Sequence, residues 1–460
     1  MVKRIAFILV LVIMIQAFAG LTVTASVPFR DLAAQSAILV EKDSGTVLFQ
    51  QNAHTRHPAD GLAKIMTLLL ASYAVENDVI SDNELVTMTE AAWLDLEDYE
   101  SPLNILPGEE MTFIDLMYSA YVGNAREANN MLAIRIARSV DAFVDMMNIT
   151  VLDFGAENTR FVNPHGRFHS GQYTTAFDQY LIFKEAMNSA LFAEVAGTFR
   201  HITEAIYEYE SRTFTSSNLL INPSSRHYVR HCVAGRDSSS FEGGYSLVAF
   251  ADDDRLALIS VVLGSYVHVF EDESTDTRSF SETVRLFHWG NEQFSWRDIL
   301  KTTDLLARVP VMHGAGADFV NARPESSVTL LLNEAVETES FIRDVTIYSI
   351  DNDEPLVAPI NAGEVLGEVV VTRDGVEYAR LPLVANTNIS LNGIEFIRRQ
   401  IMDMLATDIA RNIIIVLVAV LLLYIALVIR YNIVRINRMR KIRNAKKELI
   451  DERQQNFKEW

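Results

Sequence analysis

The sequence predicts a mixed α/β (α+β) domain, a small all-β sandwich domain after it, and a transmembrane helix near the C-terminus. Three observations support this prediction. Strand-type segments enclose a series of helical segments up to residue 295, short β-type runs follow as far as residue 391, and an unbroken apolar run occupies residues 413–429. The chain has 460 residues, 49% of them hydrophobic. This length suits about two or three domains, and this apolar content excludes a disordered chain.

Residues 1–25 have the pattern of a secretory signal peptide. Two basic residues precede an apolar stretch over 5–19, and small residues over 23–25 provide a cleavage site. An uncleaved N-terminal anchor is the alternative interpretation.

The first folded domain is expected over residues 30–295. Residues 36–49 alternate around an Asp-Ser-Gly turn signal and predict a β-hairpin. Residues 62–76 are apolar and contain neither Gly nor Pro, so they predict a buried helix. Further helices are expected over 113–122, 127–139, 141–154 and 283–293, and strands over 247–250 and 256–265. Strands at both ends with helices between them indicate an α/β or α+β domain.

A second domain is expected over residues 298–391. Its texture changes to short β-type runs separated by turns, at 327–332, 342–350, 367–371 and 379–384. Spacing of this kind predicts a small β-sandwich.

The C-terminal part predicts a membrane anchor. Apolar residues recur at helical spacing over 394–410, which predicts an amphipathic juxtamembrane helix. Residues 413–429 follow, and a helix of roughly 17 residues reaches ~26 Å, close to the thickness of a bilayer core. Eight basic residues and no acidic one lie between Arg430 and Lys447. By the positive-inside rule, the tail over 430–460 is expected in the cytoplasm and the bulk of the chain outside it.

Charge and cysteine content exclude two classes of protein. The formal net charge is −20, which argues against a nucleic-acid-binding protein because neutralising phosphates requires a basic face. Cys232 is the only cysteine in the sequence, so a disulfide framework within the chain is excluded.

A series of ordered landmarks between residues 36 and 391 resembles a known family. These landmarks are residues 36–40 (SAILV), 52–53 (NA), 57–59 (HPA), 64–67 (KIMT), 107–109 (PGE), 123–124 (GN), 161–166 (FVNPHG), 173–176 (YTTA), 244–249 (GYSLVA), 261–264 (VVLG) and 358–360 (API) with Gly363 and Gly367. They resemble D-alanyl-D-alanine carboxypeptidases, the low-molecular-weight penicillin-binding proteins of peptidase class S11. The resemblance implies a serine β-lactamase/transpeptidase-like first domain, a membrane-proximal β-domain and a cell-wall setting. It implies no cofactor.

The first motif of that family lacks its nucleophile here. Such enzymes form an acyl-enzyme on a Ser that a Lys one helical turn later activates, in the spacing S-x-x-K. Lys64 is present, but the position three residues before it is Gly61, which has no side chain to acylate. Losing the nucleophile of a serine hydrolase costs on the order of 10⁶ in rate.

The second and third motifs are also altered. S-x-N reads Val122-Gly123-Asn124, so the amide is retained and the hydroxyl is lost. K-T-G reads Arg236-Asp237-Ser238, which keeps the cation, places a carboxylate where the family has a hydroxyl, next to the incoming substrate carboxylate, and adds a side chain at the glycine position. Asn124, Arg236 and Ser238 are the candidate substrate-binding residues.

Each of these residues also has a purely structural interpretation. Lys64 either binds a carboxylate or carbonyl or is a relic solvated in an open cleft. Asn124 could cap a turn as a buried amide, and Arg236 could pair with Asp237 or Asp253. His227 and His231 have a spacing that suits a metal on a helix, but the resemblance places them on a loop or strand, so no metal site is predicted.

The sequence therefore predicts a membrane-anchored cell-wall protein that is a catalytically inactive homologue. Its expected partner is a peptidoglycan stem peptide or another cell-wall protein. The alternative is an active D-Ala-D-Ala carboxypeptidase that uses an unrecognised nucleophile, and the run Ser238-Ser239-Ser240 is the candidate for it.

Overall fold

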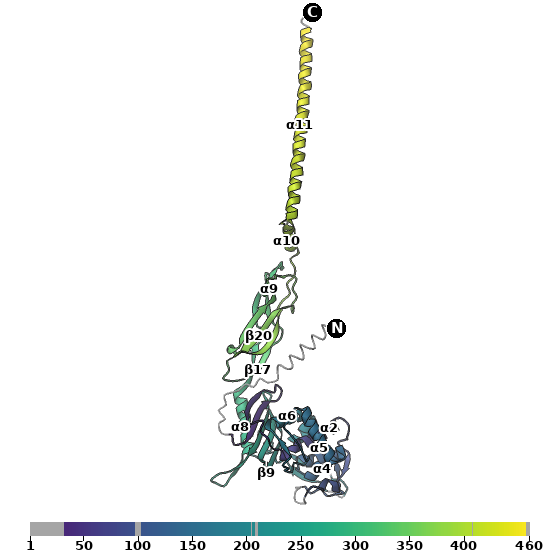
Figure 1. Cartoon of the computed structure of the whole chain (residues 1–460), viewed down its shortest axis with the longest axis vertical. Coiled ribbons are helices and arrows are strands. Elements are labelled where there is room, and N and C mark those ends of the chain that lie inside the picture. Colours follow the sequence, from purple (N-terminus) through teal and green to yellow (C-terminus); the bar gives the residue numbers. More distant parts are fainter. Residues whose placement is uncertain (1–31, 97–102, 204, 208–209, 407, 457–460) are drawn as a thin grey trace. The chain divides into compact units, whose positions relative to one another are not determined.

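A computed structural model describes residues 32–96, 103–203, 205–207, 210–406 and 408–456 (Figure 1). The signal peptide expected over 1–25 lies outside the described residues, as do the last four residues of the tail. The described residues form two compact units. Unit 1 runs up to Arg297 and includes Thr329–Glu337, and unit 2 comprises Asp298–Val328 and the residues from Thr338 onward.

A five-stranded antiparallel sheet forms the centre of unit 1. Its order is β2-β1-β11-β10-β9. The strands are β1 (Ser36–Glu41), β2 (Val47–Gln51), β9 (Cys232–Ser240), β10 (Gly244–Asp252) and β11 (Ala257–Ser265). The predicted hairpin and both predicted strands are therefore present, and the N-terminal hairpin pairs with strands more than 200 residues later in the chain.

Helices cover both faces of this sheet. Alternate side chains of a strand point to opposite faces, and Ile38, Val40, Val248 and Ile259 pack into one apolar core with the helices that precede β9. Their neighbours in sequence pack instead against Phe287 and other residues of α8 (Arg278–Gln293). The sheet thus lies between two cores, which confirms the mixed α/β fold class.

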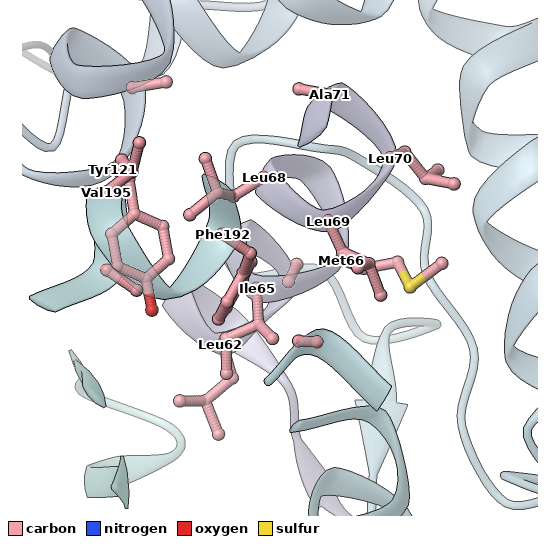
Figure 2. Close-up of a cluster of buried hydrophobic side chains, with 14 of the residues drawn as sticks. Leu62, Ile65, Met66, Leu68, Leu69, Leu70, Ala71, Tyr121, Phe192 and Val195 are labelled. Carbon is pink, nitrogen blue, oxygen red and sulfur yellow. The ribbon is translucent and has the colours of Figure 1, made fainter. Parts of the chain in front are cut away.

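Helix α2 (Ala63–Glu76) passes through the larger core (Figure 2). It is buried around most of its circumference, as its uniformly apolar sequence predicts. A short 3-10 helix, η1 (Asp60–Leu62), leads into it. The other helices of this layer are α3 (Phe113–Tyr121), α4 (Arg126–Ala137), α5 (Val140–Asp153), α6 (Ala176–Ala186) and α7 (Ala190–Gly197). The side chains of Thr112, Ser139, Thr175 and Ser189 cap the N-termini of α3, α5, α6 and α7.

Short strand pairs complete unit 1. They are β3 (His57–Pro58) with β6 (Tyr173–Thr174), β4 (Leu85–Thr87) with β5 (Glu110–Thr112), β7 (Arg200–Ile202) with β8 (Thr213–Thr215), and β12 (Val267–Val269) with β13 (Thr275–Thr277). A second 3-10 helix, η2, spans Glu90–Trp93.

The second domain is all-β apart from short helical turns. Its six-stranded sheet has the order β18-β20-β21-β16-β15-β19. The strands are β15 (Ala307–Met312), β16 (Phe319–Pro324), β18 (Ile342–Ile347), β19 (Leu356–Val357), β20 (Val365–Arg373) and β21 (Val376–Ala385). Two further strands, β14 (Phe294–Leu300) and β17 (Val328–Asn333), pair with each other, and most of both strands belongs to unit 1. The helical turns are η3 (Thr338–Ser340) and α9 (Tyr348–Asp351), so the strand expected over 342–350 ends at Ile347.

The C-terminal part is helical. Helix α10 (Gly393–Ala406) occupies the predicted amphipathic segment, and α11 (Asp408–Asn456) contains the predicted span. Within the described residues, one stretch, Arg411–Lys447, is long and apolar enough to cross a membrane. Helix α11 also continues beyond the apolar run into the basic segment, which shows regular structure where the sequence predicted only a tail.

Candidate functional site

The structure brings the motif positions together at one edge of the sheet. Gly61 lies in η1, Lys64 in the first turn of α2, and Asn124 in the turn after α3, while β9 carries Arg236 and Ser238. The backbone N–H of Gly61 donates to Ser238 Oγ at 2.9 Å. Lys64 and Arg236 both donate to Asn124 Oδ1, Arg236 over 2.6 Å. The three sequence motifs therefore meet through direct hydrogen bonds.

Lys64 is buried, so the interpretation of a solvated relic is wrong. Its exposed fraction is 3%, and within the described residues its hydrogen bonds go to the side-chain and backbone oxygens of Asn124. Burial, reinforced by the positive charges of Arg236 and Arg126, holds the pKa of the Lys64 amine well below its usual range. Gly61, three residues earlier, offers this amine no hydroxyl to activate.

Arg236 is also enclosed and does not pair with a carboxylate. Its Nη1 donates to the carbonyl oxygen of Tyr121 at 2.6 Å, and its guanidinium lies 5.2 Å from the centre of the Tyr121 ring. The carboxylates proposed as its partners are engaged elsewhere: Asp237 accepts from Ser217 Oγ at 2.6 Å, and Asp253 pairs with Arg255. The expected ion pair with Asp237 or Asp253 is therefore wrong, because the guanidinium binds the last carbonyl of α3 instead.

Asn124 is exposed rather than buried, and its carbonyl oxygen holds the two cations together. Its backbone has φ +58°, a conformation that Asn tolerates better than most residues. The preceding Gly123 is required sterically, since a Cβ there would lie 2.6 Å from Leu103 and 2.8 Å from the carbonyl oxygen of Ser119. The turn therefore presents the amide of Asn124 above Lys64 and Arg236.

The lost hydroxyl of the second motif leaves an apolar position. Val122 is 3% exposed and belongs to the main hydrophobic core. The side chain at this position stabilises the fold and offers no polar atom to a ligand.

Ser238 fills space beside the nucleophile position. A Cβ built on Gly61 would lie 3.1 Å from Ser238 Oγ and 3.3 Å from Ser238 Cβ. The neighbouring Asp60 has φ +42°, and its Oδ2 accepts from Ser240 Oγ at 2.6 Å. Burial raises the pKa of the Asp60 carboxyl, the hydrogen bond from Ser240 lowers it, and the net shift is upward. The strand that carries the third motif is thus hydrogen-bonded to both Asp60 and Gly61.

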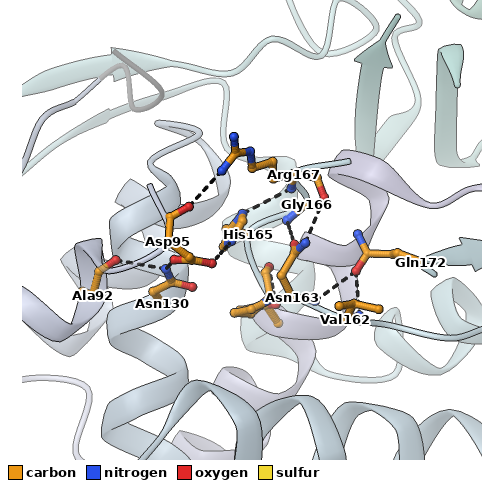
Figure 3. Close-up of polar contacts among 11 residues, drawn as sticks. Ala92, Asp95, Asn130, Val162, Asn163, His165, Gly166, Arg167 and Gln172 are labelled. Carbon is orange, nitrogen blue, oxygen red and sulfur yellow. Dashed lines mark hydrogen bonds and ion pairs between the residues drawn. The ribbon is translucent and has the colours of Figure 1, made fainter. Parts of the chain in front are cut away.

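A polar network around the buried His165, partly open to solvent at Asp95, supports this turn from the other side (Figure 3). A Cβ on Gly166, where φ is +73°, would lie 2.6 Å from the carbonyl oxygen of Asp60, so only glycine allows this close approach. The adjacent His165 is 1% exposed, donates from Nε2 to Asp95 at 2.8 Å, and accepts at Nδ1 from the N–H of Arg167 at 3.2 Å. Burial lowers the pKa of His165 despite the opposing effect of Asp95, so the ring is neutral at pH 7.

The contact between Asp95 and His165 was not predicted from the sequence. The two residues are 70 positions apart, and the sequence signals were His165 within the FVNPHG landmark and an acidic stretch containing Asp95 that was interpreted as a solvated loop near the cleft mouth. The arrangement offers no metal centre: no group of three or more potential metal-ligating residues occurs in the part of the chain that the structure describes.

Comparisons with known proteins agree with this architecture. The family model described as D-alanyl-D-alanine carboxypeptidase, peptidase S11, matches residues 21–266. The chain belongs to this family.

Similar curated proteins include the D-alanyl-D-alanine carboxypeptidases DacF of Bacillus subtilis and DacC of Escherichia coli. DacF is 26% identical over 373 residues, which cover 80% of this chain and 90% of DacF. DacC is 27% identical over 370 residues, which cover 78% of this chain and 85% of DacC. Among solved structures, penicillin-binding protein 5 of Haemophilus influenzae superposes with a TM-score of 0.56 at 23% identity, covering 79% of this chain and all (100%) of the other. This structural likeness confirms the fold that the sequence predicted.

Proposed function

We propose that this chain is a catalytically inactive member of its family that binds the carboxyl end of a peptidoglycan stem peptide at the cell membrane. One observation carries the proposal. The position from which the nucleophile would act is Gly61, and its backbone N–H is already bonded to Ser238 Oγ at 2.9 Å. Both the nucleophile and a backbone donor beside it are therefore missing from the reactive position.

The arrangement of cations supports a binding role. Lys64 and Arg236 converge on one neutral oxygen, the Oδ1 of Asn124, and their mutual repulsion contributes to the lowered pKa of Lys64. A carboxylate oxygen placed between them gains more from both cations than an amide oxygen does, because charge-assisted hydrogen bonds are the stronger ones. Asn124 is exposed, so its side chain can rotate away to admit such a ligand.

Membrane anchorage completes the proposal. We assign residues 1–25 as a cleaved signal peptide, 30–295 and 298–391 as extracytoplasmic domains, and 413–429 as the membrane span, with the basic tail from 430 onward in the cytoplasm. Support comes from the long apolar stretch of α11 and from the cluster of basic residues that follows it.

A second candidate function is residual carboxypeptidase activity with Ser238 as the nucleophile. The observation in its favour is that Ser238 Oγ lies 3.1 Å from where a Cβ at position 61 would be. Against it, Ser238 accepts the hydrogen bond from Gly61 N–H, and Lys64 bonds to Asn124. The Ser238 hydroxyl is therefore not hydrogen-bonded to Lys64, the base that would activate it, and we favour the inactive protein.

A labelling experiment separates the two candidates. The full-length chain in detergent micelles is incubated with a fluorescent penicillin and analysed by gel and intact mass, with an active family member as positive control. The inactive protein is expected to remain unlabelled. A stoichiometric adduct that disappears in Ser238→Ala, but persists in the neighbouring control Ser239→Ala, would establish the second candidate instead.

Ligand binding is measured separately. A peptide that ends in D-Ala-D-Ala is titrated calorimetrically into the same preparation, with the same peptide amidated at its C-terminus as the control. The proposal predicts binding of the free acid at least tenfold tighter than binding of the amide. Equal affinities, or no binding of either peptide, would refute the stem-peptide assignment.

A further inference from the structure

A second cavity lies in unit 1, at the opposite end of strand β9 from the site described above. Its volume is about 560 Å³, and it is bounded by the segment before β9, the end of β10 and the second half of α8. The wall begins next to Cys232, six residues before Ser238. At about 3.3 Å per residue this separates the two sites by roughly 20 Å. The volume falls within the range of small-molecule binding sites.

Cationic and imidazole groups gather on this cavity although the protein is strongly acidic. Arg230, His231 and His288 line it, and all three are exposed. Within the described residues, none of their side chains has a hydrogen-bond or ion-pair partner. Three unengaged donors around one concave surface favour an anionic ligand.

One of the two acidic groups of the lining is neutralised within the protein. Asp253 is committed within the protein: its Oδ2 pairs with Arg255 at 2.7 Å, and its Oδ1 accepts from the backbone N–H groups of Arg255 and Leu256. Glu292 is the other carboxylate, and it lies on the exposed side of α8.

The remaining wall of the cavity suits a ligand that has a hydrogen-bond donor and an apolar face. Asn291 Oδ1 is a buried atom with no hydrogen-bond partner, and Asn291 lines the cavity. A buried acceptor of this kind is stabilised when a hydroxyl or amide of a ligand donates to it. Tyr228 is exposed and supplies aromatic surface of the sort on which a sugar ring packs, whereas Phe287 lines the same cavity but is buried in the core.

We propose that this cavity is a binding site for an acidic sugar, a pyranose that carries a carboxylate beside hydroxyl or acetamido groups. The carboxylate contacts Arg230, His231 and His288, and a hydroxyl or amide of the sugar donates to Asn291 Oδ1. The site is independent of the peptide-binding site proposed above, because no residue is shared between them.

The probe for this site is N-acetylmuramic acid, and N-acetylglucosamine is the control because it has the same N-acetylated pyranose without the 3-O-lactyl group that carries the carboxylate. Binding to the full-length chain in detergent micelles is followed by saturation-transfer NMR and by calorimetry. The muramic acid is expected to bind at least tenfold more tightly than the uncharged sugar. Arg230→Ala and His288→Ala are each expected to weaken its binding at least fivefold. Arg160→Ala, an exposed arginine of unit 1 outside the cavity, is expected to leave binding unchanged.

Folding of the variants is checked by thermal unfolding, and both cavity substitutions replace exposed side chains without structural partners. Equal binding of the two sugars, competition by lactate alone at the same concentration, or unchanged binding in both cavity variants would overturn the proposal. The D-Ala-D-Ala peptide titration is unaffected by these variants if the two sites are separate, so failure of one proposal is distinguishable from failure of the other.

Discussion

The contact between Gly61 and Ser238 allows a quantitative test through a double-mutant cycle. In Gly61→Ser, the new Cβ lies 3.1 Å from Ser238 Oγ and 3.3 Å from Ser238 Cβ, so Ser238 must give way by a few tenths of an ångström. Overpacking of this kind costs about 1–3 kcal/mol. In Ser238→Gly, the N–H of Gly61 loses its acceptor, which costs about 1–3 kcal/mol, and a glycine enters a strand, which costs roughly 0.5–1 kcal/mol.

The double variant removes the steric conflict. Without the Ser238 side chain, the nearest remaining contact of the new Cβ is the Cα of residue 238 at 3.6 Å, an ordinary van der Waals distance. The double variant is therefore expected to be more stable than the sum of the single effects by about 1–3 kcal/mol, the usual size of coupling between touching residues. Unfolding in urea, followed for each variant under identical conditions, measures this coupling.

Two results would refute this reasoning. A coupling below about 0.5 kcal/mol would mean that the two positions do not touch in the way the structure shows. A Gly61→Ser variant as stable as the parent would mean that the nucleophile position is open rather than filled by Ser238.

Three further predictions concern stability. Gly166→Ala places a Cβ against a backbone carbonyl at positive φ and is expected to lower the free energy of unfolding by about 2–4 kcal/mol, measured in urea. Gly375→Ala is the control: its φ is +78° but nothing lies within 4 Å of the new Cβ, so the same measurement is expected to show a loss of only about 1–2 kcal/mol. Lys64→Met removes a buried amine whose pKa is lowered in the folded protein, so the parent gains stability as pH rises and the variant does not. The stability of the variant relative to the parent is therefore expected to fall by up to about 1.4 kcal/mol per pH unit between the folded pKa and the unfolded value near 10.4. A difference in urea unfolding that stays the same between pH 7 and 10 contradicts this. Asp95→Ala leaves the Nε2–H of His165 buried without an acceptor and is expected to cost about 1–3 kcal/mol, seen as a lower melting temperature.

Elements defined by local pattern were predicted well from the sequence. The hairpin of β1 and β2 and the uniformly apolar helix α2 occur within a few residues of their expected positions, because periodicity and turn residues act over short distances. Helix α8 begins at Arg278 rather than 283, because its first turn is mostly polar and gives no periodic signal. The spacing of Gly61 and Lys64 could also be read from the sequence, because the two residues are three positions apart, about one helical turn.

The environment of the site residues could not be predicted in the same way. Whether Lys64 is solvated or buried depends on Asn124, 60 residues away, and the partner of Arg236 is a carbonyl oxygen 115 residues away. Sequence reasoning matched opposite charges and so assigned carboxylates to Arg236. The fold satisfies the guanidinium instead with the uncapped carbonyl at the end of α3, a group that every helix end exposes and that composition does not show.

The changes in the first and third motifs are physically coupled, whereas the altered residue of the second, Val122, packs in the core. Removing the side chain at position 61 leaves space, and the added side chain at Ser238 occupies it and satisfies the N–H of Gly61. Replacing lysine by arginine at position 236 lets one cation reach both Tyr121 O and Asn124 Oδ1, which the single ammonium of lysine cannot do with the same fixed geometry. Gly61, Ser238 and Arg236 each form a hydrogen bond to a neighbouring motif, whereas Val122 packs in the core, Asp237 bonds to Ser217, and the buried atoms Asp60 Oδ1 and Arg236 Nε have no partner in the part of the chain that the structure describes. Because positions 61 and 238 are in contact, restoring a serine at position 61 alone is expected to destabilise the protein unless position 238 changes as well.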